Sequence, residues 1–465
     1  MKSIIILSGL GALTLFSEII NFKKWLYPII LLGLLACIGF AIKDWGAPAH
    51  HFYNNMMVFD NMAIAFTILL CSIVFIWLIL AKDFLSNETH LTDHLSLILF
   101  ASVGAMMMVS YGNLVMLFLG IETLSIPLYI MAGSKKNSLN SNESALKYFL
   151  MGAFATGFLL YGIALIYGVA GAFHLHTIAD YVVAERGNYP MMFYTGILFI
   201  LIGISFKVSA FPFQFWAPDV YTGAPTMVTA FMSTIVKTAA FAAFYRLFNT
   251  CFAGVGDVWI KMVIAMSVAT LLIGNIGAII QTNLKRMLAY SAIAHAGYLL
   301  IGIASIDLIS GNDSSSGNSI FYYTLAYSIG SLISFGILYN VANSTESDSI
   351  EAFNGLGKRN PFLAFAMTIS LLSLAGIPPM AGFFGKYYLF LSAIHQGKIW
   401  LVMFAVLASL IGIYYYLKVI IAMYFKPKEN LPIVVVKEYH KITIAFLLII
   451  LIVLGLAPEL FIKLF

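Results

Sequence analysis

The sequence of 465 residues is 61% hydrophobic and only 10% charged, with a formal net charge of +5 and a mean hydropathy of +0.95. A chain this apolar cannot fold as a water-soluble globule, so the composition predicts an integral membrane protein with many crossings. Its apolar runs are continuous and lack the alternating pattern of transmembrane β-strands, which favours helices over a β-barrel.

Apolar runs long enough to cross a bilayer recur almost from end to end, and we expect about fourteen membrane helices. The predicted spans are 3–20, 26–43, 58–81, 93–110, 112–132, 145–170, 191–211, 225–248, 258–281, 286–306, 319–341, 361–395 with a break, 398–424 and 441–462. The first run carries Glu18 and lacks a small-residue cleavage site, so we expect it to be retained; a cleaved signal peptide is the alternative.

Basic residues gather in alternate loops, which predicts the orientation. The odd-numbered loops contain Lys23, Lys24, Lys135, Lys136, Lys285, Arg286, Lys358, Arg359, Lys426 and Lys428. The other loops contain Asp44, Asp257, Asp307 and Asp313, together with Arg186 and Lys398. Because basic loops stay in the cytoplasm, we expect both termini to lie outside it.

Four charged residues lie inside predicted spans: Glu122, Lys207, Lys237 and Lys386. A charge near the centre of a bilayer costs about 2.5 to 3.5 kcal/mol on insertion scales, so it needs a partner, water or a function. His295, in a later span, can also titrate. Both signs occur on separate helices, which makes an internal chain of titratable sites the leading hypothesis.

Proline and glycine interrupt two of the predicted spans, at 205–225 and at 374–386. A helix cannot continue through such prolines, and broken helices at corresponding places in two halves are typical of inverted-repeat transporters. We therefore divide the single membrane domain into N-terminal helices (1–92), a first repeat (93–248), a second repeat (249–424) and a C-terminal helix (425–465). Each repeat has five helices, an odd number, so the two would be oppositely oriented.

The sequence contains no motif for a cofactor, a nucleotide or a metal. Cys37, Cys71 and Cys251 are far apart and form no C-x-x-C pair, which argues against an iron–sulfur cluster or a zinc site. A phosphate-binding P-loop and a dinucleotide-binding glycine motif are also missing. An ATP-driven pump and a self-contained redox enzyme are both disfavoured.

Five motifs together resemble the subunit N family of the bacterial proton-pumping NADH:quinone oxidoreductase, respiratory complex I, within the wider Mrp antiporter-like family. The motifs are "GIETLSIPLYIMAG", "SFKVSAFPFQFWAPDVYTGAP", "NLKRMLAYSAIAHAGYLL", "GIPPMAGFFGKYYLF" and "IGIYYYLKV". The similar subunit L has a long lateral helix after this core, and subunit M usually has a glutamate where Lys386 stands.

The resemblance implies proton translocation in the bacterial inner membrane through Glu122, Lys207, Lys237, His295 and Lys386. It also implies that NADH, FMN, iron–sulfur clusters and quinone are bound by partner subunits, among them the antiporter-like subunit M and small membrane subunits. Lys285 and Lys418 are secondary candidates. The competing interpretation for Lys285 is that it anchors a helix end. For Lys418 it is that the side chain extends to the membrane interface.

The buried charges suggest a mechanism. Burial favours the neutral forms of Glu122 and Lys207, whereas proximity favours the charged forms, so a neighbouring charge could switch the pair. We expect Lys207 to hold a proton when paired with Glu122 and to release it toward Lys237, His295 and Lys386 when the pair opens. Asp219 is expected to be a turn or cap residue at the first break.

Three classes of function stay open. The first is a proton-translocating subunit of complex I or of a related hydrogenase complex. The second is a subunit of a cation/proton antiporter, which the same lysines would serve. The third is a membrane scaffold, which the cost of four buried charges disfavours.

Overall fold

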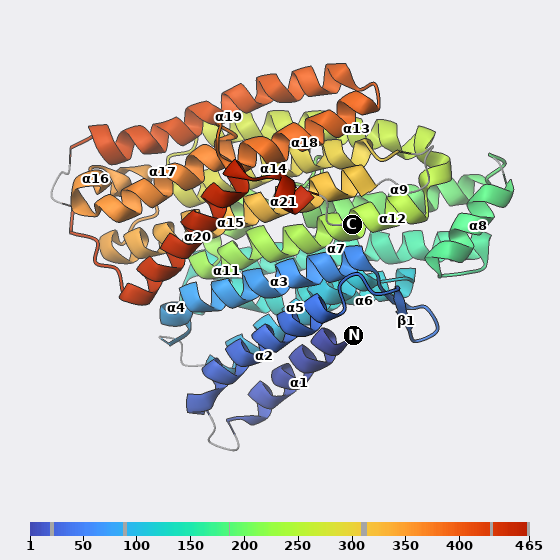
Figure 1. The fold of residues 1–465 in the computed structure, drawn as a ribbon, viewed down its shortest axis with the longest axis horizontal. Coiled ribbons are helices and arrows are strands. Elements are labelled where there is room, and N and C mark those ends of the chain that lie inside the picture. Colours follow the sequence, from blue (N-terminus) through green and yellow to red (C-terminus); the bar gives the residue numbers. More distant parts are fainter. Residues whose placement is uncertain (19–22, 87–90, 186, 308–313, 428–430, 463–465) are drawn as a thin grey trace.

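The chain forms a bundle of long helices lying side by side (Figure 1). The computed structural model describes all residues except 19–22, 87–90, 186, 308–313, 428–430 and 463–465. The first half contains α1 (Lys2–Phe16), α2 (Lys23–Lys43), α3 (Asn61–Leu80), α4 (Lys82–Ser86), α5 (Leu91–Ser110), α6 (Leu114–Ala132), α7 (Leu139–Ala170), α8 (Leu175–Glu185), α9 (Met191–Val208), α10 (Trp216–Gly223), α11 (Thr226–Phe231) and α12 (Lys237–Thr250). The second contains α13 (Gly256–Ile279), α14 (Leu284–Ala304), α15 (Ser314–Thr345), α16 (Leu356–Arg359), α17 (Pro361–Ala375), α18 (Ala381–His395), α19 (Ile399–Phe425), α20 (Glu438–Leu456) and α21 (Glu459–Ile462).

The predicted class, a polytopic all-helical membrane protein, is confirmed. Within the described residues, 12 helical stretches are long and apolar enough to cross a membrane, and α1 and α17 are shorter apolar helices. Together they account for every predicted span, with α11 and α12 joined in one passage and α17 continued by α18 after a break. An even number of crossings returns a chain to the side on which it starts, so the location of both termini on one side stays a prediction.

Several boundaries differ from the prediction. α7 begins at Leu139, six positions before the apolar run, because the side chain of Ser138 caps its N-terminus by accepting from Ser141 N. α9 ends at Val208, where Ser209 adopts a left-handed conformation ahead of Pro212. The amphipathic α8 and the short hairpin of β1 (His50–Phe52) and β2 (Met57–Phe59) were not predicted. β2 occupies the start of the predicted span 58–81, and the helix α3 begins at Asn61, where Asp60 caps it.

The centre of the bundle is formed by the helices that carry Lys237 and His295. The passage Thr226–Thr250 is buried except at its ends, and α14 is almost entirely buried. The surrounding helices include α5, α13, α15 and α18. Lys237 and His295 are therefore enclosed by protein, away from lipid.

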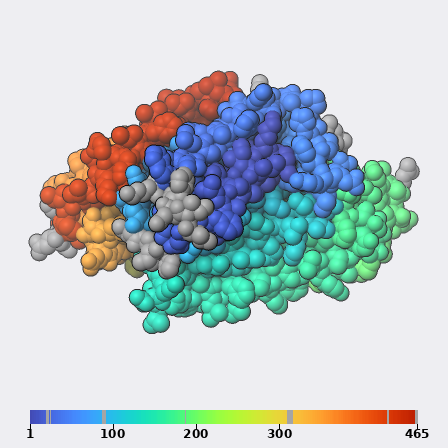
Figure 2. Space-filling view, turned by 90° about the horizontal axis from the view of Figure 1, so that it is seen from below, coloured from blue at the N-terminus to red at the C-terminus, as the bar shows by residue number. Residues whose placement is uncertain are grey.

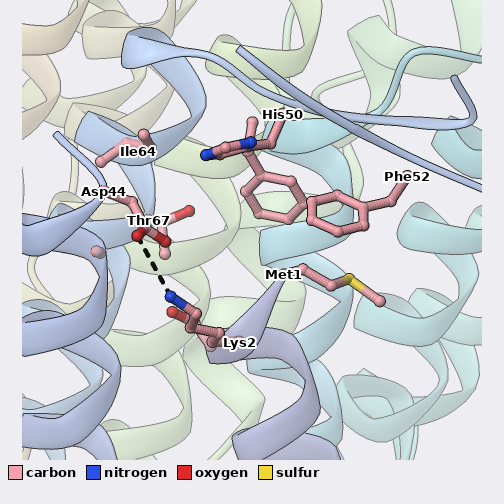
Figure 3. Close-up of a pocket in the computed structure, with 10 residues that line it drawn as sticks. Met1, Lys2, Asp44, His50, Phe52, Ile64 and Thr67 are labelled. Carbon is pink, nitrogen blue, oxygen red and sulfur yellow. Dashed lines mark hydrogen bonds and ion pairs between the residues drawn. The ribbon is translucent and has the colours of Figure 1, made fainter. Parts of the chain in front are cut away.

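The N-terminal helices cover one face of the bundle. Figure 2 shows these helices (blue) between the segment from about residue 100 to residue 200 (teal to green) and the C-terminal helices (red). At one end, a cavity of about 210 Å³ lies beside a contact of 3.4 Å between Lys2 and Asp44, with His50 and Thr67 in its wall (Figure 3). None of the predicted relay residues lines this cavity.

Candidate functional site

The first predicted interruption lies between α9 and α11. After Val208 the chain leaves the helix through Ser209 (φ 59°) and a cis Phe211–Pro212 peptide bond, and then forms the short α10. Backbone groups that lose their helical hydrogen bonds at the break have other partners inside the protein. Phe211 N donates to Thr270 Oγ1 at 2.9 Å, and the carbonyl of Phe206 accepts from Trp216 Nε1 at 3.1 Å. Irregular backbone inside a membrane protein requires such partners.

The second predicted interruption separates α17 from α18. α17 ends at Ala375, Gly376 follows with φ 83°, and the Pro378–Pro379 peptide bond is cis. A residue with a Cβ atom would be strained at this positive φ, and that atom would meet the Lys386 side chain at 2.9 Å. The break thus brings the lysine of α18 against the end of α17.

All four central titratable residues are buried: Lys207, Lys237, His295 and Lys386 are 3, 2, 4 and 6% exposed. Lys207 lies in the last turn of α9, beside the first break, and its ammonium donates to Ser125 Oγ on α6. Its nitrogen also lies 5.6 Å from the ring centre of Tyr129 and 5.8 Å from that of Tyr148. Cation–π contacts of this kind stabilise a desolvated ammonium.

The expected ion pair between Glu122 and Lys207 is not formed. Glu122 is half-buried one turn before Ser125 on α6, and no ion pair of the described residues includes it. The carboxylate is within electrostatic range of Lys207, but the ammonium donates its hydrogen bond to the Ser125 hydroxyl. The structure therefore has the open arrangement of the predicted switch.

Lys237 follows a π-helical turn, Met232–Val236, in the buried passage. Single π turns inside α-helices are frequent at functional sites. The ammonium donates to the carbonyl oxygen of Ala292 on α14, and it lies 5.3 Å from the ring centre of Tyr327 on α15. Lys237 thus contacts α14, which carries His295, and α15, which packs beside it.

His295 is enclosed by tyrosines from three helices. Its Nδ1 is 2.6 Å from the Tyr323 hydroxyl, and its Nε2 is 3.2 Å from the Tyr416 hydroxyl. The ring of Tyr327, which also contacts Lys237, is 4.7 Å away between centres. Both ring nitrogens have a hydroxyl partner, so the imidazole can receive a proton on one side and release one on the other.

Lys386 completes this group. Its ammonium donates to Ala375 O at 2.7 Å and to Ser409 Oγ at 2.8 Å. It also lies 4.5 Å from the ring centre of Tyr298, which is 6.2 Å from the His295 ring. Lys237, His295 and Lys386 are therefore linked through two tyrosines. No hydrogen bond or ring contact among the described residues joins Lys207 to this group.

The two secondary candidates differ in burial. Lys285 is only 3% exposed and donates to the carbonyl of Ala224, at the end of α10. Lys418 is half-buried and donates to Gln281 O at 2.9 Å, beyond the end of α13. Lys285 thus belongs to the interior beside the first break, whereas Lys418 secures a helix end.

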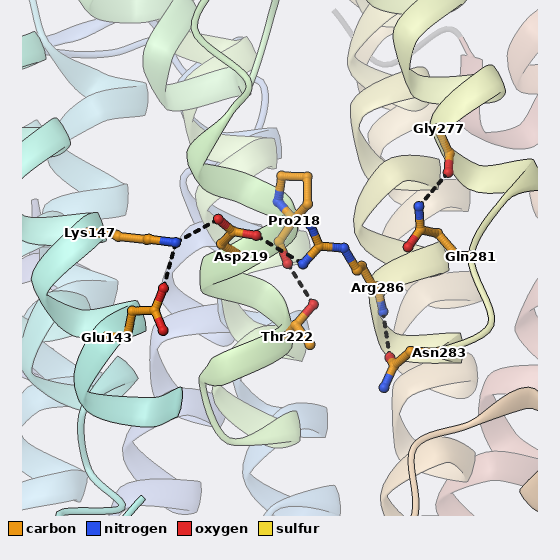
Figure 4. Close-up of polar contacts among 9 residues, drawn as sticks. All are labelled: Glu143, Lys147, Pro218, Asp219, Thr222, Gly277, Gln281, Asn283 and Arg286. Carbon is orange, nitrogen blue, oxygen red and sulfur yellow. Dashed lines mark hydrogen bonds and ion pairs between the residues drawn. The ribbon is translucent and has the colours of Figure 1, made fainter. Parts of the chain in front are cut away.

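Asp219 does more than cap a turn. Its carboxylate lies 2.8 Å from Lys147 of α7 and 2.9 Å from Arg286 of α14, and Lys147 also contacts Glu143 at 2.7 Å (Figure 4). Burial alone would raise the pKa of the Asp219 carboxyl, but hydrogen bonds from Lys147 and Arg286 hold it below its ordinary value. An ionised Asp219 therefore ties α10 to two long helices.

Four aromatic members of the site were not predicted by sequence reasoning: Tyr298, Tyr323, Tyr327 and Tyr416. Tyr298 stands three positions after His295, and Tyr323 and Tyr327 stand four apart on α15, so helical spacing places each pair on one face. That signal exists in the sequence. It does not say that α14, α15 and α19 bring these faces together.

Within the part of the chain that the structure describes, no three side chains of His, Cys, Asp or Glu come close enough to hold a metal ion. The polar groups of the site are ammonium, imidazole and hydroxyl groups. Such a set is suited to proton transfer along hydrogen bonds.

Two broken helices and a buried series of lysine and histidine define the class of an ion-translocating polytopic membrane protein. Residues 111–412 match the family model described as NADH:quinone oxidoreductase/Mrp antiporter, TM. The chain belongs to this family.

Curated relatives match over the full length. The chain is 45% identical over 465 residues to NADH-quinone oxidoreductase subunit N of Cytophaga hutchinsonii, covering 100% of this chain and 99% of the relative. It is 42% identical to the subunit N of Flavobacterium psychrophilum, with 100% of both chains covered.

Solved structures share the fold. A chain in respiratory complex I from Thermus thermophilus with bound aureothin is 30% identical, with a TM-score of 0.81 and 98% of both chains covered. A chain in the archaeal membrane-bound sulfane sulfur reductase is 24% identical with a TM-score of 0.87, covering 100% of this chain and 96% of its own length. At this lower identity the second match supports the fold alone.

Proposed function

We propose that this chain is the proton-translocating subunit N of an NADH:quinone oxidoreductase, exporting protons as partner subunits pass electrons from NADH to quinone. The observation that carries the proposal is the contiguous group Lys237, Tyr327, His295, Tyr298 and Lys386, which leads from the centre of the bundle to the second broken helix. The similarity of the chain to subunit N relatives supports a role of this group in proton translocation.

The contacts of the lysines support a relay role. Each of the three ammonium groups is stabilised by neutral oxygen atoms and ring faces, and none by a carboxylate at ion-pair distance. Such a charge can respond to a proton or charge arriving nearby, whereas a tight buried ion pair would hold it fixed. Protons would pass from Lys207 to Lys237 through water, and onward through His295 to Lys386.

Lys285 is our candidate for proton uptake into this path. It is buried at the start of α14, and its contact with Ala224 reaches the first break. The adjacent Arg286 is bound to Asp219 near the membrane surface. Lys418 is assigned a structural role, because its contacts are the carbonyls at the end of α13.

Partner subunits are implied by Glu122. On α6 it shares an outward stripe with Leu119, Ile126 and Ile130, which are 43, 52 and 56% exposed. A carboxylate on such an apolar stripe would face lipid in an isolated chain at a cost of about 2.5 kcal/mol or more. We propose that a neighbouring membrane subunit, such as the antiporter-like subunit M or a small membrane subunit, covers it. NADH, FMN, iron–sulfur clusters and quinone would be bound by partners, leaving this chain without redox chemistry.

The arrangement of helices is consistent with two inverted repeats, 93–248 and 249–424, in a bacterial inner membrane protein with both termini outside the cytoplasm. α5 packs along α6 as α13 packs along α14, and each half contains one interrupted helix. Lys207 and Lys386 each lie beside one of the breaks, Lys207 in the last turn before the first and Lys386 in the helix that follows the second.

Purification of the native assembly tests the function. We expect flavin- and cluster-binding subunits to co-purify, together with NADH oxidation by quinone that acidifies the outside. A cluster-free assembly of antiporter-like subunits that exchanges sodium or potassium for protons would replace the proposal with the Mrp-type alternative. Co-purification of a hydrogenase module in place of NADH oxidation would assign the chain to a related complex.

A further inference from the structure

An open cavity of about 730 Å³ lies where α5 begins, α6 ends and α7 begins. It is separate from the relay, and none of the relay residues lines it. α7 has 32 residues and so is about 48 Å long, whereas the hydrocarbon core of a bilayer is about 30 Å thick. The start of α7, and with it the cavity, therefore lies at the level of the lipid headgroups.

The lining of the cavity contains both apolar and basic residues. Leu97, Ile130 and Met131 are the apolar members, and Ile130 is 56% exposed on the outward stripe of α6. Lys135 and Lys136 are exposed, and neither takes part in an ion pair of the described residues. This combination matches an amphiphile with an anionic head.

The loop between α6 and α7 is held in a fixed conformation. Lys136 N donates to Ser134 O at 3.0 Å, Ser138 N donates to Lys135 O at 2.9 Å, and Asn142 Nδ2 donates to Lys136 O at 2.9 Å. The two lysines are therefore presented by ordered backbone, which lowers the entropy lost when they bind a ligand.

Two further features favour an anion here. The N-terminus of α7, capped by Ser138, carries the positive end of a long helix dipole beside the lysines. The hydroxyl of Ser134 is buried in the cavity wall and has no hydrogen-bond partner in the protein. Asp93 also lines the cavity and opposes an anion, although the two lysines outnumber it.

We propose that this cavity binds an anionic phospholipid, with the phosphate group at Lys135, Lys136 and the start of α7, and an acyl chain along Leu97 and Ile130, between this chain and the neighbouring subunit proposed to cover the stripe of Glu122. A free phosphate would satisfy the basic residues of the lining but not the apolar ones. The lipid would fill the junction of α5, α6 and α7, on the same helix that presents Glu122.

Lipid binding by the intact purified complex tests the proposal. Wild type and Lys135→Gln/Lys136→Gln complexes are delipidated in mild detergent and titrated with phosphatidylglycerol or phosphatidylcholine, and bound lipid is measured by native mass spectrometry. The matched control is Lys358→Gln/Lys426→Gln, which removes two exposed lysines from other loops of the same face. We expect the first pair to weaken phosphatidylglycerol binding by about tenfold or more and the control to leave it unchanged.

Three outcomes would overturn the site: equal losses in both double variants, no preference for phosphatidylglycerol over phosphatidylcholine in the wild type, and full competition by inorganic phosphate at millimolar concentration. If the double variant does not assemble, Lys136→Gln alone is titrated in the same way, and unchanged binding would refute the assignment. Because the readout is bound lipid, failure here leaves the proposed proton translocation unaffected.

Discussion

Lys237 joins the helices that form the centre of the relay, and its removal gives the most direct test at the scale of a residue. Lys237→Ala replaces the ammonium above Tyr327 with a methyl group and leaves Arg246, which is paired with Asp60, as the charged residue of the buried passage. We expect NADH-driven proton uptake by inside-out vesicles to fall by about tenfold or more, because a positioned proton-transfer group is lost.

Assembly of the Lys237→Ala complex should persist, measured as NADH oxidation with an artificial electron acceptor. Lys358→Ala, which changes an exposed lysine, is the control. Normal proton uptake by an assembled Lys237→Ala complex would remove Lys237 from the path.

The tyrosines around His295 make a second residue-scale prediction. Tyr416→Phe removes the hydroxyl that contacts His295 Nε2 at 3.2 Å. The substitution also removes the contact of this hydroxyl with Ser291 Oγ. Two lost hydrogen bonds of about 0.5 to 1.5 kcal/mol each correspond to a decrease in pumping of about fivefold or more. Tyr322→Phe is a matched control, because that hydroxyl donates to Leu454 O at 2.6 Å and does not contact the imidazole. Equal effects of the two substitutions would argue that the tyrosines act only by packing.

The residues of the site were only partly predictable from the sequence. The sequence alone identified Lys207, Lys237 and Lys386, because a charged residue within an apolar run can be recognised without the structure. The Ser125 contact of Lys207 was not visible, since it depends on how α6 packs beside α9. The separation of Glu122 from Lys207 in this structure was not visible for the same reason, and their pairing stays a prediction.

At the scale of an element, the breaks and spans were predictable because they follow local rules. Proline and glycine end helices wherever they occur, and apolar length sets a span. The π-helical turn before Lys237 has no such signal: Met232–Val236 reads as ordinary helix, and the extra residue in the turn reflects packing within a buried passage.

The short α10 gives an element-scale prediction. Asp219→Asn should weaken both contacts that hold α10 against α7 and α14. The carboxylate is 36% exposed, so each ion pair is worth about 1 kcal/mol or less, and the expected fall in the melting temperature is small. We expect proton uptake to fall by about threefold, because α10 adjoins the carbonyl that holds Lys285.

Glu143→Gln is the control for α10. It breaks a contact to Lys147 within α7 and leaves both links of Asp219 in place. A variant Asp219→Asn with unchanged melting temperature and unchanged proton uptake would identify the cluster as a solvated surface network.

At the scale of the whole molecule, the orientation of the chain in the membrane determines the direction in which the relay would move protons. An even number of crossings would put both termini on one face and the basic loops on the other, and this orientation stays a prediction. The lysines alone give no direction, because Lys207 and Lys386 would stand in oppositely oriented halves. Orientation must come from the loop charges, which respond to the machinery of membrane insertion.

Cysteine labelling of spheroplasts and inside-out vesicles can measure the orientation of the chain in the membrane. The three native cysteines are all buried and should not react. We expect a membrane-impermeant maleimide to label Ala49→Cys in right-side-out spheroplasts but to leave Lys136→Cys unlabelled, and to do the opposite in inside-out vesicles. Both positions are exposed, so a difference in labelling reports the side of the membrane and not burial. The reverse pattern would place the loop between α6 and α7 outside the cytoplasm. It would then contradict the proposed export direction, since Lys285 would draw protons from the wrong compartment.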